Sequence, residues 1–168
     1  MAKTGKGSSK GASSIDAITL LITDHQEVKE LFERYKELAA SDAEDDAKRD
    51  LAEQICNMLT IHAAIEEELF YPAAWDALDD VLLLNEAAVE HQSAKDLIAQ
   101  IQASDPTDAL YDAQVNVLGE YVNHHVQEEE GELFPKVQES DLDLEELGAE
   151  MSARQEELLS AEADIKDV

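Results

Sequence analysis

Two segments of this sequence, residues 62–72 and 125–135, repeat one pattern of histidine, glutamate and proline. In each segment a histidine precedes a glutamate by four positions and a proline by ten. An acidic residue followed by a histidine stands upstream of each segment, at positions 24–25 and 90–91. Four of the chain's five histidines fall on this duplicated frame: His25, His62, His91 and His125. Such a frame can close two half-sites into one buried centre for two metal ions.

The histidine and the glutamate of each repeated segment are spaced to face the same side of a helix. Residues four apart lie about one turn apart on one helix face, so both side chains can reach a metal there. Imidazole and carboxylate together suit iron, manganese or zinc. Glu67 and Glu130 are rotated by about 100° from these glutamates and are expected to point away from the metals. The predicted ligands are His25, His62, Glu66, His91, His125 and Glu129.

A single inward histidine is more often a hydrogen-bonded core residue than a ligand, and a single His-x-x-x-Glu is often a surface pair. Here each of four predicted helices carries an inward histidine, and two also carry an inward glutamate. Burying four imidazoles and two carboxylates without a counter-ion would cost several kcal/mol. A pair of metal cations accounts for the whole set.

Apolar residues recur at helical spacing through most of the chain and place the histidines on buried faces. Pro72 is expected to end or kink the second predicted helix, and Pro106 to start the fourth. Short connections predict an all-α fold, an up-down-up-down four-helix bundle with an extra C-terminal helix. The helices are expected at about residues 15–38, 44–71, 80–103 and 107–134.

The chain divides into three parts by composition. Residues 1–14 are rich in Gly, Ser and Lys and are expected to form a disordered tail. Residues 15–138 carry the predicted bundle. Residues 139–168 are acidic and leucine-rich and predict an amphipathic helix that either packs on the bundle or mediates association.

The chain is strongly acidic, with 40 Asp and Glu against 12 Lys and Arg and a net charge of −28. This charge repels phosphate backbones and anionic lipids, so we expect neither nucleic-acid nor membrane-surface binding. The sequence has no apolar stretch long enough for a membrane span and no secretory signal, which predicts a cytoplasmic protein. Walker, dinucleotide-binding and nucleophile motifs are absent, so hydrolase and nucleotide-enzyme functions have no support.

The two repeated segments and the two acidic–histidine pairs resemble those of the hemerythrin-like, or HHE cation-binding, family. The resemblance covers about residues 15–138. It implies a bundle around two non-heme iron ions, oxo- or hydroxo-bridged, that handles dioxygen or related small molecules such as peroxide and nitric oxide. It also implies that the four histidines are terminal ligands and that Glu66 and Glu129 bridge the irons.

His124 also forms an i, i+4 pair, with Glu128. Aligning Pro72 with Pro135 places His125 opposite His62, and His124 then corresponds to an isoleucine. His125 is therefore the predicted ligand, and His124 is a candidate neighbour of the ligands.

Oxygen-carrying hemerythrins of invertebrates have a second histidine on the third helix, where this chain has Lys95. Tyr121, one turn before His125, is a candidate ligand or hydrogen-bond donor; the alternative is a core tyrosine bonded to a carboxylate. The changed ligand set puts reversible oxygen carriage in doubt.

Two functions therefore stay open. The first is a di-iron protein that binds or reacts with dioxygen, peroxide or nitric oxide as a sensor, scavenger or redox protein, with weak peroxide decomposition. The alternative is an iron-buffering or iron-responsive interaction module without turnover. The sequence identifies neither the redox partner nor the oligomeric state.

Overall fold

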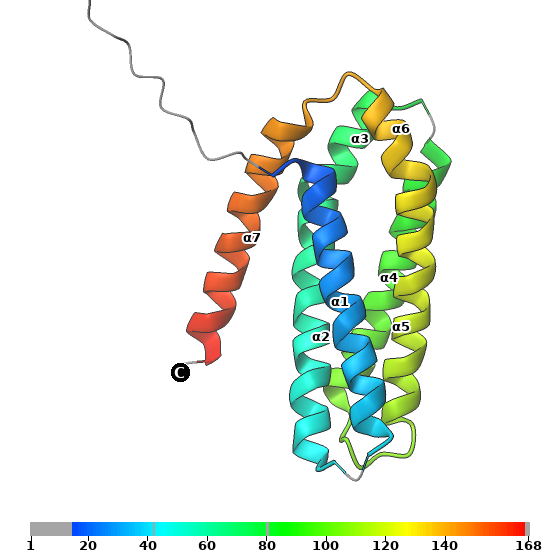
Figure 1. The fold of residues 1–168 in the computed structure, drawn as a ribbon, viewed down its shortest axis with the longest axis vertical. Helices are drawn as coiled ribbons and strands as arrows, with labels where there is room; N and C mark the ends of the chain where they lie inside the picture. The colour runs from blue at the N-terminus through cyan, green and yellow to red at the C-terminus, as the bar shows by residue number, and fades with distance from the viewer. Residues whose placement is uncertain (1–14, 42, 80, 167–168) are drawn as a thin grey trace, which may run out of the picture.

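The computed structural model describes residues 15–41, 43–79 and 81–166, so the tail predicted at residues 1–14 lies outside the described part. The described residues form helices and turns and no strands. Neighbouring long helices run in alternating directions around a common core, α1 beside α2 and α5, and α4 beside α2 and α5 (Figure 1). The predicted all-α bundle is confirmed. Its long helices are α1 (Ala17–Ala39), α2 (Asp45–Ile65), α4 (Val81–Ala103) and α5 (Tyr111–Glu128).

The starts of α1 and α5 follow from local side-chain hydrogen bonds. Asp16 caps α1 by accepting the Thr19 N–H at 2.8 Å. Before α5, the Asp105 carboxylate accepts the Thr107 N–H at 3.0 Å, and this turn competes with helix formation. Pro106 therefore stands in a turn rather than starting the helix, and α5 begins later than predicted, at Tyr111.

A π turn follows each of α2 and α5, and each begins at the glutamate of a repeated segment. The Tyr71 N–H donates to the Glu66 carbonyl five residues back, and the Phe134 N–H donates to the Glu129 carbonyl in the same way. Pro72 stands in the first turn of the next helix, where a missing donor is tolerated, so the helix continues past it. These elements are η1 (Glu66–Phe70), α3 (Tyr71–Ala77), η2 (Glu129–Leu133) and α6 (Phe134–Glu139).

The C-terminal helix α7 (Leu144–Lys166) packs on the bundle, against α1, α2 and η1 (Figure 1). Leu147 and Met151 are buried in this contact. Gly148 allows α7 to approach closely, because a Cβ at this position would collide with the backbone at the start of α1. Of the two roles left open by the sequence, packing on the bundle is therefore the one observed.

The apolar core is split into two clusters. One lies beside the π turns and includes Ile65, Phe70 and Met151; the other fills the opposite half of the bundle and includes Tyr35 and Leu118. The four predicted histidine ligands lie between residues of the two clusters in the sequence, and all six predicted ligands are buried. Within residues 15–41, 43–79 and 81–166, every helix is too short or too polar to cross a membrane.

Candidate metal centre

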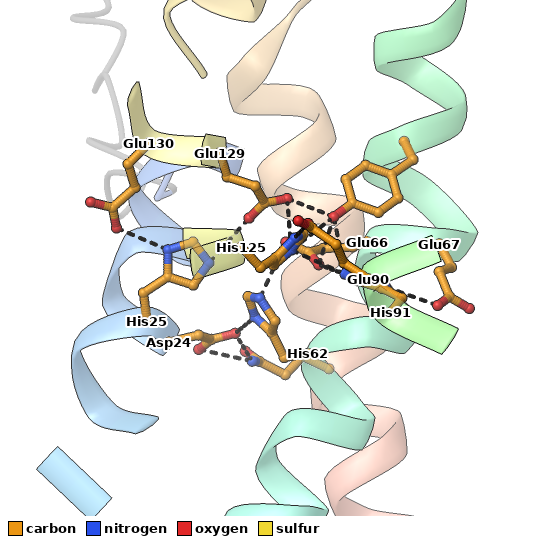
Figure 2. Close-up of polar contacts among 12 residues, drawn as sticks. Asp24, His25, His62, Glu66, Glu67, Glu90, His91, His125, Glu129 and Glu130 are labelled. Carbon is orange, nitrogen blue, oxygen red and sulfur yellow. Dashed lines mark hydrogen bonds and ion pairs between the residues drawn. The ribbon is translucent and has the colours of Figure 1, made fainter. Parts of the chain in front are cut away.

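The six residues predicted as ligands come together in the middle of the bundle (Figure 2). Each long helix provides one histidine, and each π turn provides the glutamate at its first position. All six side chains are buried, although histidine and glutamate are usually found at protein surfaces unless they are paired. The six are His25, His62, Glu66, His91, His125 and Glu129.

A first group of donors consists of His25, His62, Glu66 and Glu129. The Nε2 atom of His62 lies 3.2 Å from Oε1 of Glu66. Likewise, Nε2 of His25 lies 3.3 Å from Oε2 of Glu129. One donor atom from each of the four residues lies within 4.8 Å of all the others. A metal ion about 2.0–2.2 Å from each nitrogen and oxygen fits between atoms at such distances.

A second group lies on the other side of the same two glutamates. Nε2 of His91 lies 3.1 Å from Oε2 of Glu66, and Nε2 of His125 lies 3.4 Å from Oε1 of Glu129. Each glutamate therefore directs one oxygen toward the first pair of histidines and its other oxygen toward the second pair. This is the arrangement that a carboxylate needs in order to bridge two metal ions.

Three buried atoms of the first group make no hydrogen bond to any described residue. They are Nε2 of His25, Oε1 of Glu66 and Oε2 of Glu129. Each of these atoms lies 3.2–3.3 Å from a nitrogen or oxygen of another ligand in the group. That distance is close enough for charge interaction, but the directions do not suit a hydrogen bond. An unsatisfied buried polar atom costs about 1–3 kcal/mol. A cation between these atoms would contact all three, so the residues fit a metal.

Tyr71 adds a hydroxyl to the second group. Its oxygen lies 2.6 Å from Oε1 of Glu129 and 3.2 Å from Oε2 of Glu66. It also lies 3.1 Å from Nε2 of His91 and 3.3 Å from Nε2 of His125. A phenol has one proton and cannot donate to all four neighbours, so its oxygen lies among the donor atoms of the second group without satisfying each of them. Tyr71 is not among the site residues that the sequence predicts.

The equivalent of Tyr71 in the second repeated segment is Phe134. Its ring stacks on the imidazole of His25 with 5.9 Å between centroids and an interplanar angle of 2°. The first group therefore has an apolar ring where the second group has a hydroxyl. This difference breaks the symmetry of the duplicated site.

Each of the four histidines also contacts a carboxylate through its other ring nitrogen, Nδ1 (Figure 2). A histidine whose Nδ1–H donates to a carboxylate presents the Nε2 lone pair to a metal, as ligating histidines usually do. The Nδ1 distances are 3.1 Å for His62–Asp24, 2.7 Å for His125–Glu90, 2.9 Å for His25–Glu130 and 2.9 Å for His91–Glu67.

Glu67 and Glu130 thus point away from the metal positions, as predicted, but each holds a histidine from the other half of the chain. Lys95 stands at the position where oxygen-carrying hemerythrins have a second histidine on the third helix. It donates to Oε2 of Glu67 at 2.7 Å. The same carboxylate accepts from His91 through Oε1. Lys95 therefore supports a histidine of the centre instead of replacing one.

The carboxylates also change the pKa values of the histidines. Burial alone would lower the pKa of His62, but Glu66 and Asp24 outweigh burial and raise it to about 10. For His125 the same opposition, with Glu129 and Glu90 as partners, gives a pKa of about 11. Without a metal the centre therefore holds protons on these imidazoles, and a binding cation must displace them.

The pKa values of the two glutamates shift in the opposite direction. Burial would raise the pKa of Glu66, but His62 and His91 more than offset it and hold the pKa well below its usual range. The pKa of Glu129 is also lowered, because His125 and His25 outweigh both burial and the nearby Glu66. Both carboxylates are therefore ionised and ready to bind a cation at neutral pH.

The two additional candidates are more exposed than the six predicted ligands. Tyr121 is half exposed, and the phenol that contacts the glutamates is that of Tyr71. A role for Tyr121 beside the metals stays a prediction. His124 is exposed, with Nε2 3.2 Å from Glu128 and 3.6 Å from Glu90. Since Glu90 also contacts His125, His124 reaches the centre only through that carboxylate.

Several mycobacterial proteins are similar to this chain. Rv2633c and MT2709 of Mycobacterium tuberculosis and Mb2666c of Mycobacterium bovis, each named as an uncharacterized protein, are 32% identical to it over 103 residues. The alignment covers 60% of this chain and 62% of each of theirs, so it spans about three fifths of the length of these relatives.

A solved structure extends the comparison to most of the chain. The crystal structure of a hemerythrin HHE cation binding domain-containing protein from Mycobacterium kansasii, an Rv2633c homolog, has a TM-score of 0.71 and 26% sequence identity. The match covers 88% of this chain and 89% of that one. Residues 16–137 also match the sequence model of the hemerythrin HHE cation binding domain. The chain therefore belongs to the hemerythrin HHE cation-binding family.

Proposed function

We propose that this protein is a non-heme di-iron protein that binds or reacts with dioxygen, peroxide or nitric oxide. The observation that carries the proposal is the sharing of Glu66 and Glu129 between two pairs of histidines, one carboxylate oxygen toward each pair. Two imidazoles and two carboxylates per ion make a donor set that suits iron. Membership of a cation-binding family supports the same conclusion.

In this proposal each histidine pair holds one ion and both glutamates bridge. Tyr71 is an additional ligand of the second ion. In the metal-free site, burial and the neighbouring Glu66 and Glu129 raise the pKa of Tyr71 well above its usual value. A bound cation reverses this, because it stabilises the phenolate that replaces the phenol. The assigned ligands are His25 and His62 for the first ion, His91, His125 and Tyr71 for the second, and Glu66 and Glu129 for both.

The first ion has one protein ligand fewer, since Phe134 provides no oxygen in the place of Tyr71. We therefore assign the exchangeable position for a small ligand to the first ion. When bound, the iron pair supplies redox chemistry and an open coordination position. The phenolate and the two carboxylates are anionic and favour the more highly charged, oxidised ions. This favours a scavenging or redox role with weak peroxide decomposition over reversible oxygen carriage.

Metal analysis of the full-length protein after anaerobic loading with ferrous iron tests the proposal. We expect about two irons per chain and an absorption spectrum that changes on addition of azide or peroxide. His125→Ala should reduce the iron content, whereas His124→Ala, at the neighbouring exposed position, should leave it unchanged. Less than one iron per chain in the unmodified protein would contradict the proposal. Two irons with no response to azide would favour iron buffering instead.

A further inference from the structure

An apolar cavity of about 280 Å³ lies inside the bundle and opens onto the candidate metal centre. At one end its walls are formed by the four candidate histidines, with Asp24 and Glu90 beside them. From there it extends between the long helices. The remaining walls are mainly apolar and include Val28, Leu59, Ala94, Ile98 and Val122.

The cavity contacts the centre from its histidine side. Its described lining does not include Glu66, Glu129 or Tyr71. Those three residues lie next to the π turns, where Phe70 and Phe134 close the core. A molecule that approaches the metal positions through the bundle therefore arrives from the cavity and meets the imidazoles first.

The size of the cavity exceeds what a diatomic molecule needs. A dry, apolar cavity of about 150 Å³ holds one benzene molecule. On that scale 280 Å³ has room for about ten non-hydrogen atoms. Dioxygen or hydrogen peroxide would leave most of this volume unfilled, and apolar walls give water few hydrogen bonds. The volume and the mainly apolar lining of the cavity fit a larger, apolar occupant.

We propose that the cavity binds a neutral organic molecule of about ten non-hydrogen atoms that ends in a hydroxyl or hydroperoxide group. The apolar body lies between the helices, and the terminal oxygen points to the metal centre. An organic anion is disfavoured by Asp24 and Glu90 in the wall and by the net charge of −28, and the Lys95 ammonium that also lines the cavity is already paired with Glu67. An organic cation is disfavoured by the apolar walls. Only the orientation of the oxygen rests on the proposed di-iron function.

Linear 1-alkanols from ethanol to dodecanol are suitable redox-inert probes. Their binding to the full-length protein, metal-free and iron-loaded, can be measured by calorimetry and by the shift in melting temperature. We expect affinity to rise about fourfold with each added methylene until the cavity is full, and to fall for longer chains. In the iron-loaded protein, binding should also change the absorption spectrum, because the hydroxyl approaches the metals.

Two substitutions in the cavity wall sharpen the test. Ile98→Ala enlarges the cavity and should shift the preferred alcohol to a longer chain, whereas Ala94→Phe fills it and should abolish binding. Val89→Ala is the matched control, since Val89 lies on the exposed side of α4. Affinity that does not depend on chain length, or a preferred length unchanged in Ile98→Ala, would overturn the proposal. A length preference in a protein that binds no iron would support the cavity and contradict the di-iron function.

Discussion

The side-chain amide of Gln155, on the C-terminal helix, contacts both carboxylate oxygens of Asp24, at 3.2 and 3.0 Å. Asp24 in turn contacts Nδ1 of His62. The adjacent Arg154 donates to both oxygens of Glu68 in η1, at 2.7 and 3.2 Å. Helix α7 is thus connected to the metal centre through one carboxylate and to the repeated segment through another.

Gln155→Leu should weaken iron binding. Leucine keeps most of the volume of glutamine but removes the donor that Gln155 supplies to Asp24, so the carboxylate that orients His62 becomes less fixed. Loss of a residue that directly orients a ligand typically costs about 10- to 100-fold in metal affinity. We expect a smaller effect, roughly three- to tenfold, because Gln155 acts through Asp24. Competition with a chelator measures the affinity.

Arg154→Gln is the control for this prediction, because it breaks the contact with Glu68 and leaves Asp24 untouched. Its effect should be a small fall in melting temperature with unchanged iron affinity, since the Arg154–Glu68 pair is largely exposed. If Gln155→Leu binds iron as tightly as the unmodified protein, α7 does not influence the centre.

Tyr71→Phe should remove a visible charge-transfer band from the ferric protein and weaken binding of the second ion. The substitution makes the two halves alike, since Phe134 already occupies the equivalent position. In the metal-free protein it also removes the donor 2.6 Å from Glu129, which should destabilise the fold by roughly 1–3 kcal/mol. Absorption spectra and chemical denaturation report the two effects separately.

Tyr121→Phe is the comparison for Tyr71→Phe. Tyr121 is half exposed, so its substitution should change neither the charge-transfer band nor the stability of the metal-free protein. Identical spectra for Tyr71→Phe and the unmodified ferric protein would exclude Tyr71 as a ligand. Loss of the band in Tyr121→Phe would return that residue to the metal centre.

Glu67→Gln and Glu130→Gln should each lower iron affinity, whereas Glu68→Gln should not. Glu67 and Glu130 hold Nδ1 of His91 and His25, and an amide accepts this proton more weakly than a carboxylate. We expect losses of about tenfold, near the lower limit for such contacts, because both carboxylates are partly exposed. Glu68 contacts Arg154 on the outside. Equal affinities in all three variants would show that these histidines do not need their carboxylates.

The helices and the six candidate ligands could be predicted because both depend on local periodicity. An apolar stripe with a period near 3.6 residues fixes which side of each helix is buried. His25 falls on that stripe between Leu21 and Val28, and the other histidines are placed in the same way. Helix pairing in a short-loop bundle then brings the four stripes together.

Tyr71 could not be predicted from the same periodicity. In a regular α-helix a residue five positions after Glu66 is rotated by about 140° from it. The π turn returns Tyr71 to the side of Glu66, where its hydroxyl lies 3.2 Å from that carboxylate. The local hint was an aromatic residue before the proline in both repeated segments, Tyr71-Pro72 and Phe134-Pro135.

Gln155 illustrates a second limit of sequence analysis. Its contact with Asp24 joins residues 131 positions apart and depends on how α7 lies across α1 and α2. Composition predicts that α7 is a helix, but not against which helices it packs. Contacts of this kind follow from tertiary packing and require the structure.

The stabilisation that metal provides should increase with pH. In the metal-free protein, His62 and His125 have pKa values of about 10 and 11, against about 6.5 in the unfolded chain. Their ion pairs therefore contribute stability that is fully present below about pH 6.5 and is lost as the pH rises through those values. The lowered pKa of Glu66 acts oppositely, with a contribution that is present above about pH 4.5 and is lost as the pH falls.

In the metal-loaded protein, the contribution of the histidines to stability changes with pH in the opposite direction. Its imidazoles are neutral and metal-bound, so acid favours the unfolded chain, whose histidines take up protons below about pH 6.5. The difference in melting temperature between loaded and metal-free protein should therefore widen steadily from pH 5 to pH 8. Loading in weakly buffered solution should also release protons. His124→Ala, which alters an exposed histidine, should leave this trend unchanged. A difference in melting temperature that stays constant over this range would mean that cations and protons do not compete for His62 and His125, and that these imidazoles are not ligands.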